Sequence, residues 1–73
     1  MNALEYFKKI EKGEWVPRAG SLVNYHLRIG GPITTYNHKV VSVFAAASGN
    51  MVCFISDIRA HMSIEHVSKS KGD

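Results

Sequence analysis

The chain has only one cysteine, Cys53, and lacks long apolar runs. A single cysteine excludes a disulfide within the chain, and Cys53 lies in the apolar run 51–55, where a free cysteine is usually a small buried hydrophobe. No run approaches the roughly 18 apolar residues of a membrane-spanning helix. The N-terminal segment also lacks the apolar core of a signal peptide. These absences predict a cytoplasmic protein with no membrane contact.

Motifs for catalysis, metal binding and phosphate binding are missing as well. Cys53, His61 and His66 lack the close, paired spacing of a structural zinc site. The segment 30–32 (Gly-Gly-Pro) lacks the Lys-Ser/Thr ending of a phosphate-binding loop. The acidic residues near expected loops do not pair on one element: Glu14, Asp57 and Glu65. We therefore expect no enzymatic activity, no metal and no cofactor.

Length and charge set further bounds. A chain of 73 residues forms one domain, residues 1–73, and hides roughly 60% of its unfolded surface, so a large enclosed active site is not expected. The net charge is +3, and the nine lysines and arginines are dispersed along the chain. Dispersed charge of this size favours solubility and a weak attraction to polyanions over a specific partner.

Residues 3–12 predict a short amphipathic helix. Asn2 followed by Glu5 is a variant of the capping box, and Gly13 can close the helix in a left-handed conformation. An apolar stripe at three-residue spacing runs along the helix: Leu4, Phe7 and Ile10. Because so short a helix is marginal alone, we expect this stripe to pack on the rest of the protein or on a second copy.

The following segment, 21–68, predicts short strands. Residues 22–29 alternate between two faces. The side expected to face the core carries Val23, Tyr25, Leu27 and Ile29, and the solvent side carries Asn24, His26 and Arg28. His38 is also expected on a solvent face. Residues 34–36 can resume pairing, and the runs 39–46 and 51–56 predict a central hairpin.

The C-terminal part predicts a short pairing at 60–62, then one turn of 3₁₀ helix over 63–66 that Ser63 caps. Val67 returns to the sheet, and residues 69–73 form a polar tail that we expect to fray. Four or five short strands in so few residues predict a mainly β protein. We expect its sheet to bend into a small barrel, because closure removes exposed strand edges.

Two segments of the chain resemble a known group of proteins. Trp15-Val16-Pro17-Arg18-Ala19-Gly20-Ser21, then a strand, a Val-rich hairpin and Ser63-Ile64-Glu65-His66-Val67, resembles small phage and prophage proteins with Src-homology-3-like barrels. In those proteins a Trp-x-Pro-x-x-Gly segment leads into the first strand, and a short helical turn precedes the last. The resemblance implies such a barrel and a phage setting, but no reaction. The long first loop at 30–32 and the N-terminal helix depart from the pattern.

Aromatic and basic side chains are the candidate binding residues: Trp15, Arg18, Arg28, Tyr36, Lys39 and Arg59. Barrels of this kind often bind through aromatics and loop charges at one edge. Trp15 has a second interpretation as a ring that seals the junction of helix and barrel, and Tyr25 has one as core. Tyr36, close to the glycine loop, is the better candidate for a surface contact.

These features favour a small non-enzymatic binding or regulatory module that acts through contacts with another protein. The alternative is nucleic-acid binding, with Tyr36 stacking on a base and basic side chains on phosphates: Arg18, Arg28, Lys39 and Arg59. That alternative requires the four charges to share one face. A homodimer through the apolar helix stripe or a free strand edge is compatible with both functions.

Overall fold

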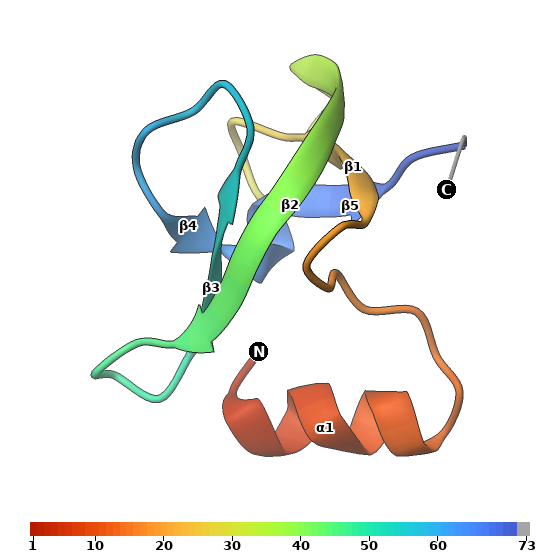
Figure 1. Ribbon diagram of the computed structural model, residues 1–73, viewed down its shortest axis with the longest axis vertical. Coiled ribbons are helices and arrows are strands. Elements are labelled where there is room, and N and C mark those ends of the chain that lie inside the picture. The colour runs from red at the N-terminus through yellow and green to blue at the C-terminus, as the bar shows by residue number, and fades with distance from the viewer. Residues whose placement is uncertain (72–73) are drawn as a thin grey trace.

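A computed structural model describes residues 1–71 as a short helix, α1 (Ala3–Glu11), and an antiparallel sheet of five strands (Figure 1). The strands are β1 (Leu22–Tyr25), β2 (Thr35–Ala45), β3 (Met51–Ile55), β4 (Met62–Ser63) and β5 (Val67–Lys69). A 3₁₀ turn, η1 (Ile64–His66), joins β4 to β5. The predicted mainly β fold with an N-terminal helix is confirmed. No helix within residues 1–71 is long and apolar enough to cross a membrane.

The sheet is curled and has the order β4-β3-β2-β1-β5, and its longest strand, β2, pairs with one neighbour along each of its two parts (Figure 1). Its first part pairs with β1, from Thr35 opposite Tyr25 to Lys39 opposite Leu22. Its second part pairs with β3, which confirms the predicted central hairpin. Within residues 1–71 the edge strands β4 and β5 do not pair with each other, so the sheet is a half-barrel (Figure 1).

The core lies in the hollow of the half-barrel and is closed by α1 and the linker 13–21. Its buried residues are Tyr6, Val16, Val23, Val40, Met51, Cys53, Ile55, Ile64 and Val67. Cys53 has no exposed surface, as predicted. The 3₁₀ turn is also as predicted, with the Ser63 hydroxyl accepting from the Glu65 amide at 3.3 Å.

The helix has the predicted position but turns a different face to the core. Asn2 caps it by accepting from the Glu5 amide, and Gly13 follows it with φ of 75°. Leu4 and Phe7 are 64% and 57% exposed, so for these two residues the first alternative, packing on the rest of the chain, is wrong, and packing on a second copy stays a prediction. The helix packs instead through Ala3, Tyr6 and Ile10. Tyr6 can occupy the core side of the helix because its ring is buried while its hydroxyl donates to the Pro17 carbonyl at 2.7 Å.

The first strand is shorter than the predicted 22–29. It ends at Tyr25 because the chain turns back: the Thr34 amide donates to the Tyr25 carbonyl at 2.7 Å and closes the loop 26–34. Leu27 and Ile29 therefore point away from the core and are exposed, contrary to the alternation. The prediction that Asn24 faces solvent is also wrong, since it is 6% exposed within β1, which lies between β2 and β5.

Two further expectations need correction. His38 is buried, not on a solvent face, because both ring nitrogens have partners: the Ser56 carbonyl at 2.8 Å and the Thr35 hydroxyl at 2.6 Å. The tail predicted to fray is ordered in its first part. Lys69 belongs to β5, and the Ser70 amide donates to the Leu22 carbonyl at 3.1 Å. The rest of that prediction, residues 72–73, lies outside the described residues.

Candidate binding site

A β-bulge in β2 forms the base of the site. Between Val23 and Tyr25 the first strand advances by two residues, whereas β2 advances by three between His38 and Thr35. Tyr36 and Asn37 thus oppose the single residue Asn24. Asn37 adopts a left-handed conformation with φ of 59°, which asparagine tolerates better than most residues. Bulges of this kind re-aim side chains and are frequent beside functional sites.

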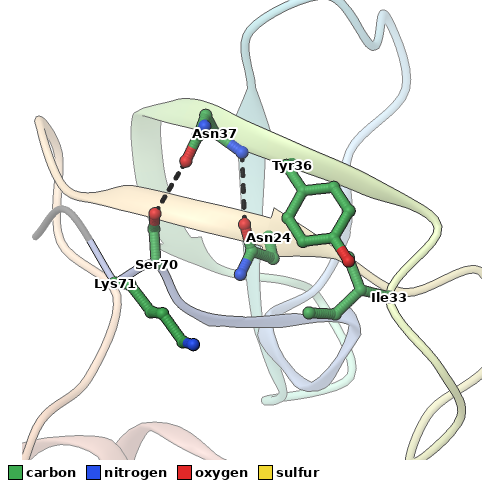
Figure 2. A pocket seen from close by; sticks show the side chains of 6 residues that line it. All are labelled: Asn24, Ile33, Tyr36, Asn37, Ser70 and Lys71. Carbon is green, nitrogen blue, oxygen red and sulfur yellow. Dashed lines mark hydrogen bonds between the residues drawn. The ribbon is translucent and has the colours of Figure 1, made fainter.

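Three polar side chains hold the bulge in place (Figure 2). The backbone N–H of Asn37 donates to Asn24 Oδ1 at 3.2 Å, and the Ser70 hydroxyl donates to the side-chain oxygen of Asn37 at 2.8 Å. Asn24 is 6% exposed and Ser70 is 2% exposed. The bulge is therefore fixed from β1 on one side and from the segment after β5 on the other.

A pocket of about 480 Å³ opens beside this network. It is lined by Asn24, Ile33, Tyr36, Asn37, Ser70 and Lys71. In Figure 2, Ile33 and Tyr36 form one wall, Ser70 and Lys71 stand opposite, and Asn24 lies between them. Tyr36 is 66% exposed, so its ring can contact a ligand. The pocket thus combines an apolar wall with a polar one, as small-molecule and peptide sites commonly do.

A second hollow of about 330 Å³ is lined by Ser68 of β5. Ser68 pairs across the strands with Asn24 of β1, which lines the pocket, so the two hollows are neighbours. In it the Ser68 hydroxyl lies 2.7 Å from His26 Nε2, and His26 Nδ1 lies 2.9 Å from the Gly31 carbonyl. A carbonyl can only accept, so Nδ1 carries the proton. A serine and a histidine in contact can act as nucleophile and base. Here the imidazole is oriented by a neutral carbonyl of its own loop, and the contacts tie the loop 26–34 to β5.

Of the predicted binding residues, only Tyr36 lines the pocket. Arg18 lies in the linker, Arg28 in the loop 26–34, Lys39 in β2 and Arg59 in the loop 56–61, and all four are exposed. Figure 1 shows the linker and the loop 56–61, which carry Arg18 and Arg59, on different sides of the half-barrel. The structure therefore does not bring all four charges together.

Trp15 takes up a different place from these residues. Its ring is half-buried and packs against the core, at the junction of α1 and the barrel.

Sequence reasoning missed most of the pocket: Asn24, Ile33, Asn37, Ser70 and Lys71. The one local signal was Asn37, because asparagine is favoured where the backbone turns left-handed. Nothing local marked Asn24 and Ser70, whose roles depend on contacts 13 and 33 residues away in sequence.

An aromatic cluster on the outer face of the β2–β3 hairpin was missed too. The rings of Phe44, Phe54 and His61 lie 5.8 to 6.0 Å apart between centroids. Across residues 1–71, no group of three or more His, Cys, Asp or Glu side chains is placed to hold a metal ion.

Comparisons of the chain with protein-family models, with curated proteins and with solved structures gave no match.

Proposed function

We propose that this protein is a small non-enzymatic binding module that takes a short segment of another protein in the pocket beside the β2 bulge. The observation that carries the proposal is an exposed tyrosine beside a buried, polar and fixed pocket floor. Binding energy at protein interfaces is concentrated in such anchors, and tyrosine is among the most frequent of them.

The two walls of the pocket suit a peptide. An extended peptide offers a carbonyl oxygen at every residue and side chains between them. Ile33 and Tyr36 can pack on one of those side chains, while the side-chain amides of Asn24 and Asn37 donate to its carbonyls. Because the bulge is held by hydrogen bonds before any ligand arrives, little ordering is required on binding.

We also propose that the half-barrel is a Src-homology-3-like barrel, with the phage setting that the resemblance implies. The sheet order and the 3₁₀ turn directly before the last strand support this assignment. The segment from Trp15 to Gly20 leads into β1, as in the proteins that the chain resembles.

Nucleic-acid binding is the less favoured function. Affinity for DNA or RNA depends on several cations that reach phosphates along one face. The linker that contains Arg18 and the loop 56–61 that contains Arg59 lie on different sides of the half-barrel, which does not favour a shared phosphate-binding face (Figure 1). The exposed ring of Tyr36 can equally well contact a peptide, and within residues 1–71 Lys71 is the only cationic side chain that lines the pocket.

Selection from a peptide library tests the proposed function. We expect displayed peptides to be enriched on the wild-type protein, and Tyr36→Ala to weaken the best of them about tenfold, as for an interface anchor. Phe7→Ala is the matched control, because it removes an equally exposed ring from α1 and should change affinity less than about twofold. Absence of enrichment, or equal effects of the two substitutions, would refute the proposal.

A further inference from the structure

We infer that the pocket recognises a carboxylate attached to an apolar body, such as the C-terminus or an acidic side chain of a peptide. The inference rests on the proposed function and adds the chemical class of the ligand. Its basis is the set of hydrogen-bonding groups that the pocket presents, taken with the absence of an acidic lining residue within residues 1–71.

The orientation of the Asn24 amide is fixed by its partner. The Asn37 backbone N–H can only donate, so the atom that it meets at 3.2 Å is the Asn24 oxygen. The Asn24 NH₂ must then point the other way, and Figure 2 shows its nitrogen turned to the space between Lys71 and Ile33. Every fully buried side-chain N or O atom in residues 1–71 has a partner, whereas the Asn24 NH₂ makes no hydrogen bond there. This NH₂ group therefore reaches solvent through the pocket.

The other polar groups of the pocket are also donors. The Asn37 oxygen accepts from Ser70, which leaves the Asn37 NH₂ without a hydrogen bond in the described part of the chain. Lys71 adds a positive charge at the rim, and the Tyr36 hydroxyl can donate as well as accept. A ligand that satisfies this set must supply acceptors, and a negative charge strengthens each hydrogen bond.

A carboxylate fits this set better than a phosphate. Two neutral amides and one lysine match the two oxygens and single charge of a carboxylate, whereas phosphate sites commonly use arginine forks or several backbone amides. The apolar wall of Ile33 and Tyr36 can pack on hydrocarbon next to the carboxylate. A free inorganic anion would leave that wall without a contact.

Titration with small probes tests the inference. N-acetyl-leucine and N-acetyl-leucinamide have the same apolar body, and only the first carries a carboxylate at pH 7. We expect N-acetyl-leucine to shift the NMR signals of the Asn24 and Asn37 side-chain NH₂ groups saturably, and the amide to bind at least about tenfold more weakly. Capped Leu-Glu and Leu-Gln dipeptide amides separate a side-chain carboxylate from a chain terminus. Equal affinity for the charged and neutral members of both pairs would overturn the inference.

Two substitutions test whether N-acetyl-leucine binds in the pocket. Asn24→Asp keeps an oxygen for the Asn37 N–H but replaces the donor with an acceptor, so binding of N-acetyl-leucine should be lost. Lys71→Gln alters only an exposed side chain and should weaken binding several-fold, while Lys8→Gln removes the same charge from α1 and should not. Backbone amide spectra establish that each variant is folded. Wild-type affinity in both Asn24→Asp and Lys71→Gln would contradict a carboxylate site.

The outcomes also separate the inference from the function on which it rests. If library peptides depend on Tyr36 but bind equally to Asn24→Asp, the protein is a binding module and the carboxylate assignment is wrong. If no peptide depends on Tyr36, the proposed function itself fails.

Discussion

Cys53 lies at the centre of the core, paired with Val43 across β2 and β3, and has no exposed surface. Burial raises the pKa of its thiol to about 11, because the protein interior disfavours the charged thiolate. The thiolate is the reactive form, so both its low population and its burial protect this cysteine.

We therefore predict that Cys53 of the native protein does not react with Ellman's reagent at pH 8, whereas the urea-unfolded chain reacts fully. The raised pKa also sets the direction in which stability depends on pH. The contribution of the Cys53 thiol to the free energy of unfolding is complete below the ordinary pKa of 9.0. It is lost as the pH rises to about 11, because the unfolded chain releases the proton first. Urea unfolding at pH 7 and pH 10.5 measures the loss of stability. Rapid reaction of Cys53 with Ellman's reagent in the native protein would contradict its burial.

The buried polar residues depend on long-range hydrogen bonds that a local sequence pattern does not contain. The alternation of 22–29 placed Asn24 in solvent, and His38 was also expected on a solvent face. Both are buried, and both bond to groups distant in sequence. The partner of Asn24 is 13 residues away and the carbonyl partner of His38 is 18 away. A pattern read over a few residues contains neither contact.

Among the elements, α1 is attached to the barrel by one face and leaves the opposite face in solvent. Tyr6 is buried on the attached face, and its hydroxyl bonds the linker at Pro17. Leu4 and Phe7 are largely exposed although they give the helix its amphipathic pattern, and the Phe7 ring meets the Tyr6 ring edge to face at 5.3 Å. Desolvation raises the pKa of Tyr6, as burial of a phenol should.

Substitutions on the two faces should differ in cost. Tyr6→Phe removes the buried hydrogen bond and leaves the Pro17 carbonyl without its donor, so we expect a loss of about 1 to 2 kcal/mol in the free energy of unfolding. Leu4→Ser should change it by less than about 0.5 kcal/mol. Phe7→Ser should cost about 0.5 to 1 kcal/mol, because it removes the edge-to-face contact with the Tyr6 ring. Urea denaturation of the three variants measures these values. A larger cost for Phe7→Ser than for Tyr6→Phe would mean that the helix docks through its apolar stripe.

Elements with local causes were predicted best. The helix bounds follow from Asn2 and Gly13, the hairpin from the turn at 48–50, and the 3₁₀ turn from its Ser63 cap. The length of β1 and the bulge in β2 were not predictable from the sequence. They depend on how β2 divides its pairing between two neighbours, which is a property of the sheet and not of any one strand.

At the scale of the whole molecule, three surfaces formed by residues 1–71 expose aromatic side chains. They are the pocket with Tyr36, the outer face of α1 with Phe7, and the cluster that includes Phe44 on the β2–β3 hairpin. Only the first combines an exposed ring with a cavity and a buried polar floor. Exposed apolar side chains alone are common on protein surfaces, so the other two surfaces carry less weight.

The most direct test of the central claim is to map where a peptide binds. Backbone and side-chain NMR signals should be followed while the strongest library peptide is added to the protein. The account predicts that the largest shifts fall on Asn24, Tyr36 and Asn37, with little change at Phe7 or Phe44. Shifts concentrated on α1 or on the hairpin cluster, with the pocket unchanged, would contradict it.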